Sequence, residues 1–137
     1  MTQRIILITG GSEGMGLAAA ERFHAMGDQV VITGRSHEKM NKVSSRHSGI
    51  HTIVSDISCP DDRVRLFADI REHFGHIDVF FANAGLGLFK PFADISEEDF
   101  DFIADVNYKG LFFSLQGALG LMPHRSKIIV NASWTHH

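Results

Sequence analysis

The chain has 137 residues, of which 44% are hydrophobic and 21% are charged, as expected for one soluble globular domain. Folding at this length buries roughly 70% of the surface of the unfolded chain, so neither a disulfide nor a metal is needed for stability. The 13 basic and 16 acidic residues give a net charge of −3, whereas proteins that bind nucleic acid normally carry a basic surplus. The single cysteine, Cys59, excludes an internal disulfide and favours a reducing, cytoplasmic location.

Short apolar runs alternate with longer segments of helical periodicity. In chain order, we expect a strand over residues 5–9, a helix over 14–26, a strand over 29–33, a helix over 38–46, a strand over 50–54, a helix over 61–74, a strand over 77–82, a helix over 96–122 and a strand over 127–131. The first apolar run is too short for a membrane span or a signal-peptide core, so no membrane partner is expected.

This alternation indicates an α/β domain whose parallel strands are joined by right-handed helical crossovers. The sequence has no internal repeat, low-complexity segment or linker, so we expect residues 1–137 to form a single domain. The one long irregular stretch covers residues 85–95. Long loops at the carboxyl ends of parallel strands are where sheets of this class bind ligands.

A glycine-rich turn, Thr9-Gly10-Gly11-Ser12-Glu13-Gly14-Met15-Gly16, joins the first strand to the first helix. Free backbone N–H groups at a helix start, together with the helix dipole, favour a phosphate. Glycines let the backbone approach a pyrophosphate without an intervening Cβ, although glycines in such turns can also serve a purely steric purpose. The strand-turn-helix context therefore predicts a dinucleotide-binding turn.

Four further motifs follow this turn in order: Asp56 after the third strand, Asn83-Ala84-Gly85 after the fourth, Asn107 in the long helix, and Ile129 to Ser133 at the fifth strand. Together with Thr9, Gly10, Gly14 and Gly16, they resemble the short-chain dehydrogenase/reductase family over essentially the whole chain. The resemblance implies a Rossmann-like, doubly wound parallel sheet of strand order 3-2-1-4-5. It also implies an oxidoreductase that transfers hydride between a nicotinamide cofactor and a small-molecule carbonyl or alcohol.

The resemblance places the cofactor along the carboxyl ends of the strands. Asp56 would accept a hydrogen bond from the adenine amino group and Ile57 would offer a backbone donor, while Asp56 also fits a turn or N-cap position. Asn83 would both approach the cofactor and tie neighbouring strands together. The expected cofactor-binding residues are Gly10, Ser12, Glu13, Gly14, Met15, Gly16, Arg35, Asp56, Ile57, Asn83, Ala84 and Gly85.

The end of the second strand bears on the choice of cofactor. An acidic residue there would bind the ribose 2′-hydroxyl of NAD(H) and repel a 2′-phosphate. The corresponding position is Gly34, followed by Arg35, whose guanidinium suits a phosphate. We therefore expect NADP(H) to be favoured over NAD(H). Glu13 counts against this preference, because many NADP-preferring relatives carry a basic residue in that turn, and Arg35 could instead be a solvated loop cation.

Two residues are candidates for the catalytic set that the resemblance implies. Asn107 is a poor helix-interior residue, and in the family this asparagine holds a water in the proton relay to the catalytic lysine. Ser133 would hydrogen-bond the substrate carbonyl. Its register is open, because aligning the asparagines would place the serine site at Trp134 instead.

The family's catalytic tyrosine, followed four residues later by a lysine that lowers its pKa, has no counterpart in this sequence. The only tyrosine is Tyr108, and Phe112 stands four residues later. The pair would be expected shortly after Ser133, so we expect a chain truncated after the fifth strand that binds cofactor weakly and turns over no substrate. The exposed apolar edge left on that strand predicts a homo-oligomer, or partial disorder near the C-terminus.

Other functions fit the sequence less well. A non-catalytic nucleotide-binding or interaction module is the main alternative, and a methyltransferase of Rossmann-like fold is disfavoured because it would need neither Arg35 nor Asn107. The nine histidines have no supporting cysteine cluster and no His-Glu-x-x-His motif, so no metal is expected.

Overall fold

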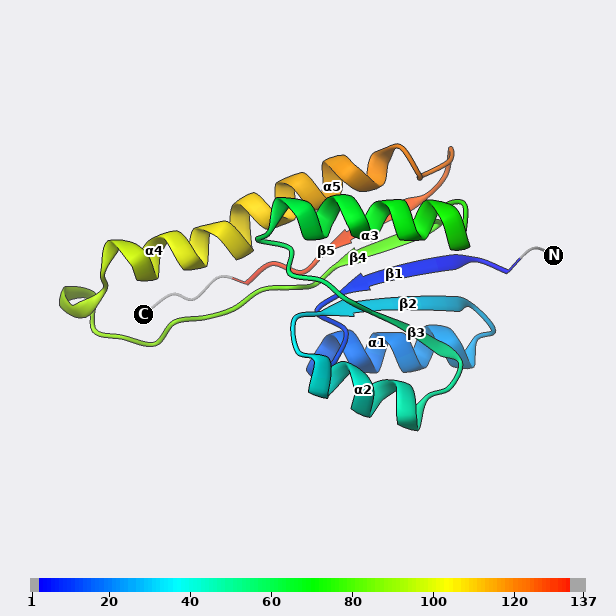
Figure 1. The fold of residues 1–137 in the computed structure, drawn as a ribbon, viewed down its shortest axis with the longest axis horizontal. Helices are drawn as coiled ribbons and strands as arrows, with labels where there is room; N and C mark the ends of the chain where they lie inside the picture. Colours follow the sequence, from blue (N-terminus) through cyan, green and yellow to red (C-terminus); the bar gives the residue numbers. More distant parts are fainter. Residues whose placement is uncertain (1–2, 134–137) are drawn as a thin grey trace.

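The computed structural model describes residues 3–133 and contains one five-stranded parallel sheet (Figure 1). Its strands are β1 (Ile5–Thr9), β2 (Gln29–Gly34), β3 (Ile50–Val54), β4 (Val79–Ala82) and β5 (Lys127–Val130). The spatial order β3-β2-β1-β4-β5 confirms the doubly wound, Rossmann-like sheet expected from the sequence. The central strand β1 pairs on both sides, so that Ile6 lies opposite Val30 of β2 and Val79 of β4.

Helices cover both faces of this sheet (Figure 1). They are α1 (Gly14–Ala25), α2 (His37–Arg46), α3 (Pro60–His73), the 3-10 turn η1 (Phe92–Asp94), α4 (Glu97–Ala104), the π-helical turn η2 (Asp105–Gly110) and α5 (Leu111–Leu119). Helices α1 and α2 lie on one face, α3 and α5 lie on the other, and α4 extends past the carboxyl edge of the sheet. Within residues 3–133, no helix reaches the length and apolarity that crossing a bilayer requires.

The core consists of one apolar cluster on each face of the sheet. Along β1, side chains alternate between the faces, so that Ile6 and Ile8 pack with Met40 under α1 and α2. Leu7 points the other way and packs with Phe80 under α3 and α5. Because both faces are covered, β1 is buried throughout, which explains why it reads as a continuous apolar run.

Two of the expected elements differ from the structure by more than one residue at a boundary. The strand expected over 77–82 begins only at Val79, because the N–H of Ile77 donates to the carbonyl of Leu121 (2.8 Å) before the chain enters the sheet. The single helix expected over 96–122 is instead divided into α4, η2 and α5, and α5 ends at Leu119. The division at η2 follows from a side-chain contact that is described with the site below.

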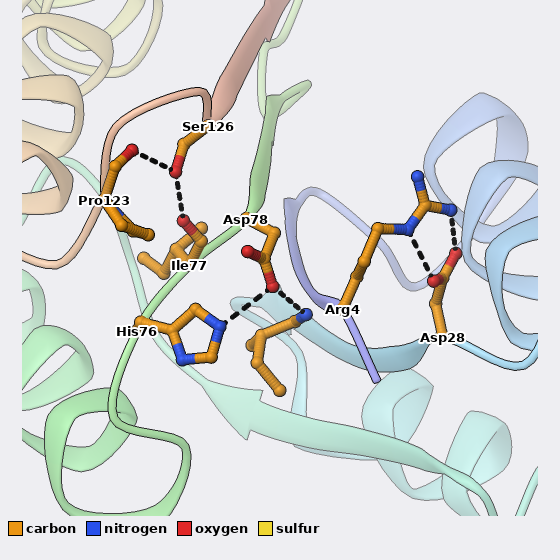
Figure 2. A network of polar contacts seen from close by, with 8 residues as sticks. Arg4, Asp28, His76, Ile77, Asp78, Pro123 and Ser126 are labelled. Carbon is orange, nitrogen blue, oxygen red and sulfur yellow. Dashed lines mark hydrogen bonds and ion pairs between the residues drawn. The ribbon is translucent and has the colours of Figure 1, made fainter. Parts of the chain in front are cut away.

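Polar side chains hold the amino edge of the sheet together (Figure 2). Two guanidinium nitrogens of Arg4, Nε and Nη2, donate to the Asp28 carboxylate (2.8 and 2.6 Å), which joins the start of β1 to the start of β2. The Asp78 carboxylate accepts a hydrogen bond from the N–H of Ile5 (2.7 Å), which joins β1 to β4. The Ser126 hydroxyl contacts carbonyl groups that precede β4 and β5. Side-chain contacts therefore join the strands at the amino edge, and the carboxyl edge is available for a ligand site.

We predict that Arg4→Ala lowers the free energy of unfolding by about 1–2 kcal/mol, because it leaves the Asp28 carboxylate, only 7% exposed, without its partner. Urea unfolding of the two proteins measures the difference. The matched control is Lys42→Ala, which removes an exposed ion pair with Glu38 and should cost less than about 0.5 kcal/mol. Equal losses in the two variants would contradict this account of the amino edge.

Candidate functional site

A cavity of about 1270 Å³ opens at the carboxyl edge of the sheet, and the loops after all five strands contribute to its lining. It exceeds the volume of about 300–1,000 Å³ that is common for small-ligand pockets. The predicted site residues among its lining are Gly10, Ser12, Glu13, Met15, Arg35, Asp56, Ile57, Asn83, Ala84, Gly85, Asn107 and Ser133. Gly14 and Gly16 do not line it. The fold thus brings residues far apart in sequence to one elongated site.

The turn between β1 and α1 is built on a close backbone approach that only glycine permits. A Cβ added at Gly16 would lie 2.1 Å from the carbonyl oxygen of Gly10. Gly10 and Gly14 both have positive φ angles, 64° and 57°, which L side chains rarely adopt. The N-cap residue Glu13 makes no side-chain cap hydrogen bond, so the first N–H groups of α1 have no side-chain acceptor from it. This arrangement suits a bound anion.

Asn83 ties the glycine turn to the neighbouring strands. Its side-chain Nδ2 donates to the backbone carbonyl of Gly10 (3.0 Å), and its side-chain Oδ1 accepts from Nδ2 of Asn131 (2.9 Å). The hydroxyl of Thr9 accepts from the backbone N–H groups of both Asn83 and Ala84 (3.1 Å each). The ends of β1, β4 and β5 are therefore joined around the cavity by small polar side chains that leave its interior open.

The loop after β3 is held in a fixed shape. Asp56 accepts from the backbone N–H and the hydroxyl of Ser58 through Oδ1 (2.9 and 2.7 Å), while its own N–H donates to Asp62 (2.8 Å). The turn position considered for Asp56 is thus occupied. Within residues 3–133 only Oδ1 of the carboxylate is engaged, so a contact between Oδ2 and a ligand is geometrically compatible with the turn.

Sequence reasoning missed Arg63, which fixes the same loop from behind. This arginine of α3 is 7% exposed, donates to the carbonyl of Ile57 and lies 5.4 Å from the centre of the Phe113 ring of α5. A Cβ added at Gly110 would come within 2.9 Å of the same Ile57 carbonyl. Helix α3 and the turn η2 therefore hold Ile57 between them. A lone arginine among the charged residues of an amphipathic helix gave no sign of this contact.

Asn107 explains the interruption of the long helix. Its Oδ1 accepts from the backbone N–H of Leu86 (2.9 Å), and its Nδ2 donates to the Leu86 carbonyl (2.8 Å). Asn107 lies within the π-helical turn η2, and such turns often occur at functional sites. The Asn107 side chain thus forms with Leu86 the two backbone hydrogen bonds that a neighbouring strand would otherwise form. These bonds position the loop after β4 along the cavity.

A second contact holds the far part of the same loop. Lys90 pairs with Asp99 of α4 (2.7 Å), and Asp99 also accepts from the backbone N–H of Ser96, which forms a capping box with the Ser96 hydroxyl. The hydrogen bond from Lys90, with that from the Ser96 N–H, lowers the pKa of Asp99 to about 2. The carboxylate therefore stays ionised at neutral pH and keeps α4 attached to the loop.

The end of β2 lies close to the side chains of Met40 and Ser12. A Cβ added at Gly34 would lie 2.9 Å from the sulfur of Met40 and 3.5 Å from the hydroxyl of Ser12. The next residue, Arg35, is exposed, with its guanidinium 5.8 Å from the centre of the Phe102 ring. Ser36, Lys39, Thr33 and Ser55 also line this part of the cavity, and the sequence analysis did not single them out.

Ser133 lies at the rim of the cavity beyond β5, whereas the competing position, Trp134, is outside the described residues. In β5 itself, Ile128, Ile129 and Val130 are each 44% exposed, so the apolar edge expected from the sequence is present. Assembly into an oligomer stays a prediction. Within residues 3–133, no group of three or more His, Cys, Asp or Glu side chains is arranged to hold a metal ion.

We predict that Gly16→Ala lowers the free energy of unfolding by about 3 kcal/mol, because the added methyl meets rigid backbone at Gly10. Gly14→Ala is the matched control: a Cβ there meets nothing within 4 Å, so only its positive φ is penalised, by about 1 kcal/mol. Urea unfolding compares the two variants. A loss at Gly14 equal to or larger than that at Gly16 would refute the close-approach argument.

We also predict that Asn107→Ala speeds hydrogen exchange at the Leu86 amide by about tenfold, because that N–H loses its acceptor. Exchange followed by NMR resolves this single amide. Gln116→Ala, at an exposed position of α5, should leave the Leu86 amide unchanged. An Asn107→Ala protein with normal protection at Leu86 would show that the loop is held by other contacts.

Comparison with known proteins agrees with this architecture. The family described as short chain dehydrogenase matches residues 4–135. A sepiapterin reductase of Chlorobaculum tepidum is 39% identical over 131 residues, covering 88% of this chain and 54% of the relative. An uncharacterized oxidoreductase of Staphylococcus haemolyticus is 35% identical over 118 residues, covering 85% of this chain and 51% of the relative.

Solved structures give the same result. The short-chain dehydrogenase/reductase of Brucella melitensis described as a glucose/ribitol dehydrogenase superposes with a TM-score of 0.87 at 33% identity, covering 93% of this chain and 55% of that one. A short-chain dehydrogenase from Streptomyces avermitilis gives a TM-score of 0.85 at 25% identity, covering 95% and 48%. The chain spans about half the length of the relatives it matches. On its fold, its motifs and this match, the chain belongs to the short-chain dehydrogenase family.

Proposed function

We propose that this chain forms the NADP(H)-binding part of a short-chain oxidoreductase that interconverts a small carbonyl compound and its alcohol by hydride transfer. The observation that carries the proposal is the glycine turn, where the start of α1, at Glu13 and Met15, lines a cavity that Arg35 and Asp56 also line. An extended ligand with a central diphosphate and a purine at one end fits that combination of groups.

Each part of the cavity has a corresponding part of the cofactor. The backbone between Gly10 and Gly16 would receive the diphosphate, because no side chain intervenes at the close approach. The free Oδ2 of Asp56 and the backbone N–H of Ile57 would receive the adenine. The chain segment from Asn83 to Gly85 would lie along the middle of the cofactor. When bound, the nicotinamide supplies the site that donates or accepts hydride.

The preference for NADP(H) over NAD(H) rests on the end of β2. Position 34 is Gly, so the carboxylate that would repel a 2′-phosphate is absent there. Arg35 is exposed beside the cavity, where its guanidinium can form two parallel hydrogen bonds to a phosphate. These features support a phosphate on the adenosine ribose.

The substrate end is only partly built from these residues. Ser133 at the cavity rim would donate a hydrogen bond to the substrate carbonyl and polarise it. Asn107 already binds the Leu86 backbone with both side-chain atoms, so in this structure it acts by positioning that loop. The sequence contains no Tyr-x-x-x-Lys pair to move the proton, and we therefore expect these 137 residues to bind cofactor without turning over substrate.

Location and assembly form part of the same proposal. The lone Cys59 fits a reducing compartment, and we place the protein in the cytoplasm. The exposed apolar side chains of β5, together with Phe112 and Phe113 of α5, favour association with another chain, and we propose an oligomer.

We predict that Arg35→Ala raises the dissociation constant for NADPH by about 10- to 100-fold, because charge-assisted hydrogen bonds to the phosphate are lost, and leaves that for NADH within about twofold. Isothermal titration calorimetry on the 137-residue chain measures both. Arg46→Ala, an exposed arginine at the far end of α2, is the control and should change neither. Equal loss for both cofactors, or NADPH oxidation by the pure chain, would contradict the proposal.

A further inference from the structure

An ion pair joins the two helix starts that border the adenosine end of the cavity. Lys39 in the first turn of α2 lies 2.7 Å from the carboxylate of Glu13, which is the N-cap residue of α1. Both residues line the cavity. The pair therefore lines the same cavity as Arg35, for which the proposed function gives a contact with the ribose phosphate.

The position of Lys39 is fixed by the start of its helix. Ser36 caps α2, and its hydroxyl accepts from the backbone N–H of Lys39 (3.2 Å). Ser12, the neighbour of Glu13, has its hydroxyl 3.5 Å from the point where a Cβ at Gly34 would lie. The ends of the turn, of β2 and of α2 therefore meet within a few side chains of one another.

The Glu13–Lys39 pair is easily exchanged for another ionic contact. The side chains are 69% and 48% exposed, and ion pairs this exposed contribute only about 0–1 kcal/mol to stability. A phosphate carries up to two negative charges and several acceptor oxygens, whereas the Glu13 carboxylate carries one charge. A phosphate that binds beside Arg35 can therefore replace Glu13 as the ionic partner of Lys39. The phosphate then lies near the Glu13 carboxylate, which has lost its partner.

We propose that Lys39 is a second cation for the 2′-phosphate and that Glu13 is a specificity-determining residue that reduces the affinity for that phosphate. Glu13 acts in two ways: it competes for the Lys39 ammonium, and it repels the incoming phosphate. A cofactor without the 2′-phosphate leaves the pair intact. The inference rests on the proposed function and assigns the cofactor discrimination of this chain to Arg35 and Lys39 acting against Glu13.

The inference also accounts for a conflict between residues. Glu13 stands in the turn where a basic residue would favour NADP(H), while Gly34 and Arg35 favour that cofactor. If the carboxylate is paired with Lys39, the local charge of the pair is zero, and Arg35 supplies the net positive charge at this end of the cavity. The unfavourable charge of Glu13 and the favourable charge of Arg35 then together give a moderate preference for NADP(H).

The test is calorimetric titration of NADPH and NADH into the 137-residue chain and its variants. Glu13→Gln should tighten NADPH binding by about fivefold, because the competing charge is gone, with NADH changed by less than about twofold. Lys39→Met should weaken NADPH binding by about fivefold or more, again with NADH unchanged. In the Lys39→Met background, the gain from Glu13→Gln should be smaller, because only the repulsion remains to be relieved.

The chain offers a matched control in the next ion pair of α2. Glu38 and Lys42 are also 2.7 Å apart and exposed, but neither lines the cavity. Glu38→Gln and Lys42→Met should leave both dissociation constants unchanged. The same titrations with adenosine 2′,5′-bisphosphate and adenosine 5′-monophosphate isolate the 2′-phosphate and should show the same pattern.

The outcomes separate the inference from the proposed function. If the unaltered chain binds NADPH but Glu13→Gln and Lys39→Met leave the ratio of the two dissociation constants unchanged, the inference is wrong and the proposed function stands. If the variants shift both cofactors equally, the pair only stabilises the turn, and the inference is again wrong. If the unaltered chain binds neither dinucleotide, the proposed function and the inference fail together.

Discussion

The close approach of the α1 backbone at Gly16 to the carbonyl oxygen of Gly10 is the constraint on which the site depends. With 2.1 Å between that oxygen and the point where a Cβ would lie, no other residue fits at Gly16 unless the turn moves. The approach lets α1 begin after a turn of four residues that follows β1, so that Glu13 and Met15 at its start line the cavity. The same Gly10 carbonyl accepts from Asn83, which transmits the position of the turn to β4.

The two edges of the sheet are held by different kinds of contact. At the amino edge, the side chains of Arg4, Asp28 and Asp78 join neighbouring strands (Figure 2). At the carboxyl edge, Thr9 and Asn83 do the same with short neutral groups that bind backbone. Because these short side chains bind backbone groups, the loops after the strands stay apart and line the cavity.

The sequence predicted the layers of the fold well, because a parallel sheet covered on both faces requires buried apolar strands and glycine or proline at their ends. The strand order was confirmed, and the boundaries of β1 and β3 were right to the residue. The continuous helix over 96–122 was wrong, because helical periodicity does not register a contact such as that between Asn107 and Leu86. The unfavourable helix propensity of Asn107 was the one available signal.

The sequence indicated residues that line the candidate site, but not which side chains contact one another there. The residues after each strand end were found by motif, whereas Arg63 and Lys39 were not, because their roles depend on groups distant in sequence. Glu13 appeared in the sequence as a residue opposed to the expected cofactor, and only the structure shows that Lys39 neutralises it. Pairings of this kind arise from the crossing of two loops and leave no periodic pattern along the chain.

The central claim is that the diphosphate of a dinucleotide binds the backbone N–H groups at the start of α1. The most direct measurement is a titration of the 137-residue chain with NADPH, followed through its backbone amide resonances. The account predicts saturable shifts at Gly14, Met15 and Gly16, where the N–H groups border the turn, together with shifts at Ile57. Saturable binding that left the amides from Gly10 to Gly16 undisturbed, or no binding at all, would contradict it.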